Sequence, residues 1–182
     1  MNLYFRLFSL LFRHWFSSKS AASVSEDFVI SLRALPFDCD ANMHLTNSRY
    51  LAFGDLGRID MMLKTGLAAA SLKQRWLGVV NAQSITYIRP IKPLSKLELH
   101  SKLLGWDEKY WYFEHRFIGQ DTLYASILVR GVFIRGKSVI TMTDLLHLIG
   151  DTQPSPELPL RVIHWKQLLS TKKQESAVVL QQ

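Results

Sequence analysis

Cysteine is almost absent from this chain of 182 residues, which contains Cys39 alone. A single thiol excludes an intramolecular disulfide, so nothing in the composition indicates an oxidising compartment. On a strand, the side chain of Cys39 would face away from its neighbours Asp38 and Asp40. Because free cysteines are mostly small buried residues, we favour a packing role for Cys39 over a nucleophilic one.

Several motifs with well-understood chemistry are also missing. The sequence has no Gly-x-Ser-x-Gly elbow, no Walker loop and no dinucleotide fingerprint. Its histidines do not show metal-ligand spacing, so we expect neither a metal nor another cofactor. The net charge is +7, but no basic stripe interleaves with aromatic residues as in nucleic-acid modules. The charge therefore favours a membrane surface or a phosphate-bearing ligand over nucleic acid.

The longest apolar run is residues 1–16, which is shorter than the roughly 20 residues needed to span a bilayer. Its polar residues recur at helical spacing, giving a narrow basic stripe on an apolar helix: Asn2, Arg6, Ser9 and Arg13. We expect an amphipathic helix that contacts an anionic membrane surface. Two alternatives stay open: packing against the protein's own core or a partner subunit, and a signal peptide cleaved near residues 21–23. Arg13 and His14 argue against the signal peptide.

The rest of the chain predicts one domain, residues 27–170, preceded by a small polar linker at 17–26 and followed by a disordered tail at 171–182. Helical periodicity covers 50–67, with Gly66 as its terminator, and Gly54 and Gly57 inside it indicate a close approach by another group. Weaker helical patterns lie at 143–148 and 160–169. Strand patterns joined by short turns cover 28–35, 77–89, 96–106, 109–118 and 123–135. Short connections require antiparallel neighbours, so we predict an α+β fold in which a sheet of about five strands wraps a long central helix.

The most informative stretch sets a carboxylate, an amide and an imidazole at alternate positions, Asp40, Asn42 and His44. Such groups supply a base, a positioning hydrogen bond and a proton donor or acceptor. The helix that follows would present unpaired backbone N–H groups to a carbonyl oxygen gaining negative charge. This combination indicates acyl transfer to water. Alone, Asp40 would more often cap a turn, Asn42 would be a turn residue, and His44 would be a structural histidine.

The motif D-x-N-x-H-x-x-N-x-x-Y-L, which begins at Asp40, resembles the signature of the hotdog-fold thioesterases. This superfamily includes 4-hydroxybenzoyl-CoA thioesterase and the plant acyl-ACP thioesterases. In the plant enzymes such a triad forms the active site, and in the 4-hydroxybenzoyl-CoA type the second acid of a D-C-D triplet is catalytic. The chain departs from the plant pattern at Thr46 and lacks the glycine that follows the acid in the other type. Residues 103–107 and 156–159 resemble a thioesterase-like subgroup found in bacteria and animals.

The resemblance implies hydrolysis of acyl-CoA or acyl-carrier-protein thioesters, with Asp40 as general base or nucleophile. It also implies a homodimer or homotetramer with sites between subunits. We expect a cytoplasmic location, and residues 1–16 leave open peripheral attachment to the inner membrane face. Aromatic residues could line an acyl tunnel or simply pack the core: Trp106, Tyr110, Trp111 and Tyr112. The alternative function is a non-catalytic protein that binds acyl-CoA or acyl lipids, or associates with membranes.

Other residues are expected to support the site. Asn47 would cap the helix or fix the loop. In relatives an acid near the place of Asp55 sometimes faces the substrate, and here Asp55 would form a buried pair with Arg58 or take a solvated position. The cations around a proline-containing turn, Arg89, Lys92 and Lys96, would bind CoA phosphates, although such charges often lie on a solvated edge. Glu114 and His115 cannot both face inward on one strand, so neither is assigned a role.

Overall fold

The computed structural model describes residues 2–16 and 22–179. Its centre is an antiparallel sheet of six strands, whose bounds are β1 (Asp27–Arg33), β2 (Leu77–Tyr87), β3 (Lys96–Trp106), β4 (Trp111–Gly119), β5 (Thr122–Arg135) and β6 (Ser138–Ile140). The strand order is β1-β3-β4-β5-β2, with β6 paired to β5. The five longer strands match those predicted from alternation and turn residues.

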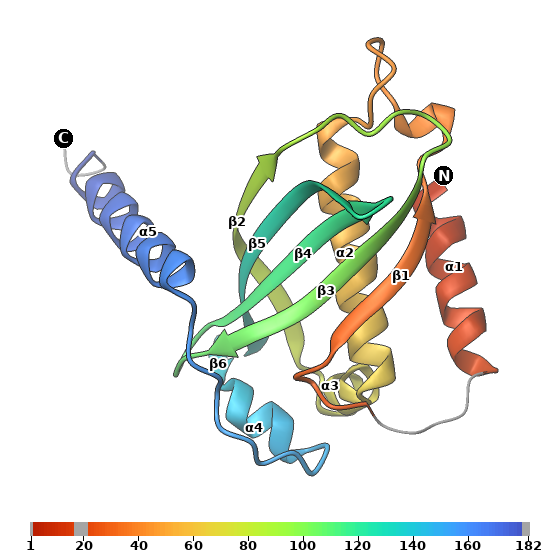
Figure 1. Ribbon diagram of the computed structural model, residues 1–182. Coiled ribbons are helices and arrows are strands. Elements are labelled where there is room, and N and C mark those ends of the chain that lie inside the picture. Colours follow the sequence, from red (N-terminus) through yellow and green to blue (C-terminus); the bar gives the residue numbers. More distant parts are fainter. Residues whose placement is uncertain (1, 17–21, 180–182) are drawn as a thin grey trace.

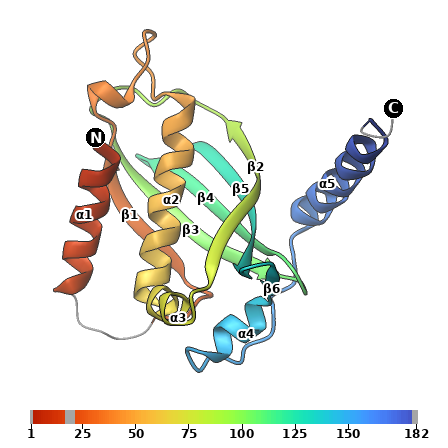
Figure 2. The ribbon, with the colours of Figure 1, turned by 180° about the vertical axis from the view of Figure 1, so that it is seen from behind.

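The helices are α1 (Asn2–Trp15), α2 (Asn47–Lys64), α3 (Leu67–Gln74), α4 (Met142–His147) and α5 (Leu160–Val179), with a short 3-10 helix at Pro36–Asp38. Figure 1 and Figure 2 show the sheet curled around α2, with α1 beside α2 along the β1 edge. This arrangement confirms the predicted fold class, an antiparallel sheet wrapped around a long helix.

The core lies between α2 and the concave face of the sheet. Alternate residues of β3 point inward, and Leu97, Leu99 and Leu103 are all buried. The start of α2 is anchored by Tyr50, whose ring packs edge-on against Tyr87 and Phe117. Burial, and then the neighbouring Tyr87, raises the pKa of Tyr50 to about 12, so this buried phenol stays neutral.

The two glycines inside α2 allow the helix to lie close to the sheet. A Cβ on Gly57 would lie 2.2 Å from the Ser101 hydroxyl oxygen, and one on Gly54 would lie 3.2 Å from the His115 ring. Glycine costs about 1 kcal/mol relative to alanine inside a helix. That cost is offset here by space for two polar side chains of the sheet.

The two edge strands of the sheet, β1 and β2, differ in how far they are covered. At one edge, α1 covers β1, and the inner side chains of α1 pack on the core, namely Leu3, Leu7 and Leu10. At the other edge, β2 is exposed along almost its whole length. Long exposed edges are templates for pairing with another chain. The strand β2 therefore lacks the protection that α1 gives β1.

The helical predictions are corrected in several places. The central helix runs over Asn47–Lys64, three residues earlier than predicted, and Gly66 follows it with a φ of 80°. Neither α3 nor β6 was predicted. The expectation of a disordered tail is wrong for residues 171–179, which continue α5, and 180–182 lie outside the described residues.

The linker prediction is also only partly tested. Residues 17–21 lie outside the described residues. In the part that follows, Val24 is completely buried and the Ala22 N–H donates to the Lys64 carbonyl, so residues 22–26 pack on the domain instead of linking freely.

Candidate active site

The residues Asp40, Asn42 and His44 lie in a tight loop that projects from the end of the molecule where α2 begins (Figure 1). A bridge between Cys39 and Leu45 closes the loop, and the Asp40 N–H donates to the His44 carbonyl over 2.8 Å. Oxygen Oδ1 of Asp40 accepts the backbone N–H groups of Asn42 at 2.9 Å and His44 at 3.2 Å. Asp40 thus fixes the loop with one oxygen, and Oδ2 has no hydrogen-bond partner within residues 2–16 and 22–179.

The loop holds its three polar residues together through the backbone. Asp40 and Asn42 are exposed and His44 is half-buried. The left-handed backbone of the loop falls on Met43, with a φ of 57°, and not on Asn42, whose alternative role was a turn residue. The structure therefore combines the turn-capping role of Asp40 with an exposed carboxylate oxygen able to accept a proton.

The cysteine between the two acids is a poor nucleophile in this setting. Partial burial, and then the charges of Asp38 and Asp40, raise the pKa of the Cys39 thiol. Because the thiolate is the reactive form, these neighbours disfavour nucleophilic chemistry at Cys39.

The N-cap of the helix that follows the loop lies one residue before the expected one. Thr46 is the N-cap residue, and Asn47 is the first residue of α2. The expectation that Asn47 caps the helix is therefore wrong. No side chain caps this helix start, and the Arg49 N–H donates to the Thr46 carbonyl over 2.8 Å.

The proline-containing turn with three cations lies against the same loop. The Leu45 N–H donates to the Ile91 carbonyl over 2.8 Å, which joins the turn to the base of the Asp40 loop. Arg89, Lys92 and Lys96 are all exposed around this turn. The structure thus brings the predicted phosphate-binding segment next to the predicted catalytic segment, although the two are about 45 residues apart.

The first acid of the D-C-D triplet has a different environment from the second. Asp38 is completely buried, and its Oδ2 accepts the Arg6 guanidinium at 2.8 Å and the Leu35 N–H at 3.0 Å. Its Oδ1 lies 3.4 Å from Nε of Arg49. Arg6 also donates to the Arg33 carbonyl over 2.8 Å. One carboxylate therefore connects α1, the end of β1 and the first turn of α2.

Sequence reasoning did not identify this role for Asp38. Acids in loops usually face solvent, and the partner Arg6 is 32 residues away in the chain. The available signal was the helical spacing that puts Arg6 and Leu10 on one face of the N-terminal helix.

A second buried polar group connects α2 to the sheet. The completely buried His115 lies 2.9 Å from the Ser101 hydroxyl through Nδ1 and 3.0 Å from Nη1 of Arg58 through Nε2. Arginine can only donate, so Nε2 of His115 accepts and Nδ1 carries the proton. Arg58 in turn pairs with Asp55, whose side chain is 55% exposed.

This network corrects the earlier omission of His115. As expected for adjacent residues of one strand, Glu114 and His115 do not both face inward, because Glu114 pairs with Arg161 on the other face of the sheet. The missed signals were Gly54 and Gly57, which are spaced to leave room for His115 and Ser101. Asp55 pairs with Arg58, but its side chain is 55% exposed, so the structure combines the expected partner with the solvated position.

The aromatic residues considered for an acyl tunnel pack the interior. Trp111 contacts Phe133 and covers Gly131, where a Cβ would lie 2.0 Å from its ring. Tyr112 is buried and donates its hydroxyl to Asp107 over 2.9 Å. Core packing was the alternative to an acyl tunnel for these aromatic residues, and Trp106, Trp111 and Tyr112 are buried in this way.

Comparison with solved structures defines the fold. The chain is similar to a probable thioesterase from Bartonella henselae, with a TM-score of 0.59 and 18% identity over 64% of this chain and 99% of that one. It is also similar to a gentisyl-coenzyme A thioesterase, with a TM-score of 0.60 and 16% identity over 65% and 98% of the two chains. The fold is the hotdog fold. Residues 34–165 match the family model of the thioesterase-like superfamily, and the chain belongs to this family.

Relatives by sequence include a protein called THEM6 from Xenopus laevis, 30% identical over 132 residues, which are 72% of this chain and 63% of that protein. A probable thioesterase of Saccharomyces cerevisiae is 33% identical over 121 residues, covering 64% of this chain and 52% of the yeast protein. The chain thus spans between half and two thirds of the length of these two relatives.

Asp38 and Asp40 should differ sharply in their contribution to stability. Asp38→Ala leaves Arg6 and Arg49 without their buried anion, and we expect it to lower the free energy of unfolding by about 3–5 kcal/mol. Asp40→Ala removes only the acceptor of an exposed turn and should cost about 1 kcal/mol or less. Urea denaturation of the two single variants measures the difference, and equal losses would contradict the assignment of Asp38 as the anchor.

His115 should make stability depend on pH. Burial, and then the Arg58 charge, holds the pKa of His115 well below its ordinary value of 6.5. As the pH falls below 6.5, the unfolded chain binds a proton that the folded chain does not, so stability is lost toward acid pH. This group alone should account for a loss of about 2 kcal/mol between about pH 7 and about pH 5.

The matched variant is His115→Gln, which keeps a donor and an acceptor but does not titrate. Its unfolding free energy should show a slope against pH that is shallower than that of the wild type by this amount. Parallel curves for the two proteins would show that the pKa of His115 is the same in the folded and the unfolded chain, and would reject the lowered value.

Proposed function

We propose that this protein is an acyl thioesterase that hydrolyses thioesters of coenzyme A or acyl-carrier protein. The observation that carries the proposal is the Asp40 loop. Its exposed carboxylate has one unpaired oxygen, and it lies between an uncapped helix start and a basic turn in a chain of the thioesterase-like family. The names of the relatives support the same reaction class.

In the proposed reaction, Asp40 takes a proton from water, and the water oxygen forms a bond to the thioester carbon. The oxyanion that develops would be stabilised by backbone N–H groups of the first turn of α2. The C–S bond then breaks, and the proton passes from Asp40 to the leaving thiolate. In the alternative, the Asp40 carboxylate attacks the thioester carbon directly and the C–S bond breaks, so that a thiolate leaves and an anhydride forms; water then cleaves the anhydride to the acid and the free Asp40 carboxylate, and the proton released goes to the thiolate.

The neighbouring residues have supporting roles in this proposal. His44, half-buried at the end of the loop, would polarise the carbonyl, and Asn42 would orient the water. Arg89, Lys92 and Lys96 would bind the phosphates of coenzyme A, because the turn that carries them is joined to the loop at Ile91 and Leu45.

A second copy of the chain would complete the site. Asp40 is exposed in the single chain, whereas this chemistry benefits from a site that excludes water. The exposed edge of β2 carries apolar side chains, including Val79, Val80 and Tyr87. A homodimer formed by pairing two β2 edges would bury them and remove the unprotected edge. We expect sedimentation to give a dimer or a tetramer.

The Asp40 variants test the reaction. With a panel of acyl-CoA thioesters, Asp40→Asn and Asp40→Ala should reduce kcat by at least about 100-fold, the usual contribution of a general base. Asp121→Asn is the control, because Asp121 lies in the exposed turn between β4 and β5. Wild-type turnover in the Asp40 variants would reject the mechanism. Binding of acyl-CoA without turnover in any variant would favour the non-catalytic alternative.

We also propose that α1 contacts a lipid surface. Its outward face carries large exposed apolar side chains, with Trp15 82% exposed: Tyr4, Phe5, Phe8, Phe12, Trp15 and Phe16. Contiguous apolar surface of this kind marks an interaction site. No helix in residues 2–16 and 22–179 is long and apolar enough to cross a bilayer.

Replacement of the outward face tests this contact without disturbing the inner face of α1. The triple variant Phe8→Gln, Phe12→Gln, Trp15→Gln should bind anionic vesicles at least about tenfold more weakly than the wild type. The control is Leu160→Gln with Leu168→Gln, which removes exposed apolar side chains from α5. Equal pelleting of all three proteins would remove the proposal.

A further inference from the structure

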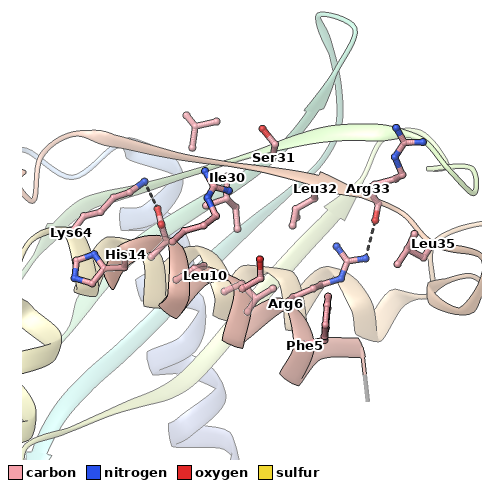
Figure 3. A pocket seen from close by; sticks show the side chains of 15 residues that line it. Phe5, Arg6, Leu10, His14, Ile30, Ser31, Leu32, Arg33, Leu35 and Lys64 are labelled. Carbon is pink, nitrogen blue, oxygen red and sulfur yellow. Dashed lines mark hydrogen bonds and ion pairs between the residues drawn. The ribbon is translucent and has the colours of Figure 1, made fainter. Parts of the chain in front are cut away.

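A cavity of about 360 Å³ lies between α1, the outer edge of β1 and α2 (Figure 3). No residue of the Asp40 loop lines it, so it is separate from the candidate active site. Its volume is within the range of small-ligand sites. Apolar side chains from all three elements contribute to its wall, among them Leu10, Ile30, Leu32 and Leu56.

The cavity exists because α1 covers the β1 edge without pairing to it. The Ala34 N–H donates to the Ser95 carbonyl, and the Ala34 carbonyl accepts the Leu94 N–H. The Arg33 carbonyl points to the opposite side of the strand, toward α1, and accepts a hydrogen bond from Arg6. By the alternation of an antiparallel strand, Ser31 and Val29 turn their N–H and C=O groups to the same side as Arg33. The wall therefore combines apolar side chains with backbone donors of an edge strand.

The charge of the lining is unbalanced. Four of the lining residues are Arg or Lys, and Asp60 is the one acid among them. Asp60 is already paired with Lys64 at 2.7 Å, and Arg6 is held by the buried Asp38. Arg13 has no acidic partner within the part of the chain that the structure describes. In Figure 3, His14 and Lys64 lie at one end of the cavity and Arg6 and Leu35 at the other.

We propose that this cavity binds a single-chain anionic amphiphile, specifically a fatty carboxylate of about a dozen carbons. The carboxylate lies at the end formed by Arg13, His14 and Lys64, and the alkyl chain runs along Leu10 and Ile30 toward Leu35. The length follows from the volume, because an apolar cavity of about 150 Å³ holds the six carbons of benzene. A neutral ligand would leave Arg13 unmatched, and a multi-chain lipid would exceed the volume.

This inference does not depend on hydrolysis at Asp40, because the ligand contains no thioester and the cavity contains no part of the Asp40 loop. The two proposals can therefore fail separately. Turnover of acyl-CoA tests the first, and binding of a free carboxylate in the absence of vesicles tests the second.

The experiment is calorimetric titration of the full chain with dodecanoate below its micelle-forming concentration, with dodecanol and dodecyl phosphate as parallel ligands. Dodecanoate and dodecyl phosphate should bind with one-to-one stoichiometry, and dodecanol at least about tenfold more weakly, since it lacks the charge-assisted contact. A preference for the phosphate would identify a phosphate headgroup, not a carboxylate, as the natural anion and would overturn the choice of a fatty acid. Equal affinity for dodecanol would overturn the charge argument.

Two variants place the ligand. Arg13→Glu reverses the unmatched charge at the carboxylate end of the cavity, and Leu10→Trp fills the cavity; each should weaken dodecanoate binding by at least about tenfold. Lys172→Glu makes the same charge change on distant α5 and should have no effect. Circular dichroism checks that each variant is folded.

Four outcomes would reject the site. Dodecanoate would not bind up to its solubility limit, or it would bind equally to the wild type, Arg13→Glu and Leu10→Trp. In the third, binding would be lost in the outward-face variant of Phe8, Phe12 and Trp15 but kept in Leu10→Trp, which would place the ligand on the surface of α1. Loss of binding on Asp40→Asn would place it in the active site instead and would equally reject the cavity.

Discussion

The arrangement of the candidate site depends on one buried carboxylate. Asp38 accepts from Arg6 of α1 and from the Leu35 N–H, and it lies beside Arg49 in the first turn of α2. The backbone carbonyl of Asp38 also accepts the Thr46 N–H, at the N-cap of α2. A buried anion persists only with such partners, because its desolvation costs several kcal/mol. The partners come from three segments, so their positions are fixed together with that of the loop between them.

The two acids of the D-C-D triplet therefore have different environments, although their side chains are identical. On a fully extended chain, two acids separated by one residue would point to the same side. Here the 3-10 helix at Pro36–Asp38 ends at Asp38, and the side chain of Asp38 is buried. The loop closed by Cys39 and Leu45 then keeps Asp40 at the surface. Burial with cations makes the first carboxylate a structural element, whereas the second lies exposed with one oxygen outside the hydrogen bonds of its loop.

Much of the fold could be predicted from the sequence, because strands with inward residues at every second position and short turns allow few arrangements. The start of α2 was misplaced because Asn47, Ser48 and Arg49 are polar and carry no periodic signal. The small helix α3 follows directly on the left-handed Gly66 and is rich in alanine, so its apolar pattern is weak. For the candidate site, the sequence indicated the short motif of Asp40, Asn42 and His44, because its residues are neighbours in the chain. The contacts of Asp38 with Arg6 and of Arg58 with His115 join segments that are far apart in sequence. Such partners are fixed by packing, which a local pattern does not encode.

The N-terminal helix α1 contacts both the sheet edge and the residue that anchors the candidate site. Its inner face closes the β1 edge, its Arg6 satisfies Asp38, and its outer face presents aromatic side chains to the surroundings. A helix that is apolar on nearly all sides is the kind found buried in proteins. The domain covers one face incompletely, leaving the cavity beside β1, and leaves the other face open. Because Arg6 contacts the residue that anchors the Asp40 loop, any ligand or surface that shifts α1 acts directly on the carboxylate below the candidate active site.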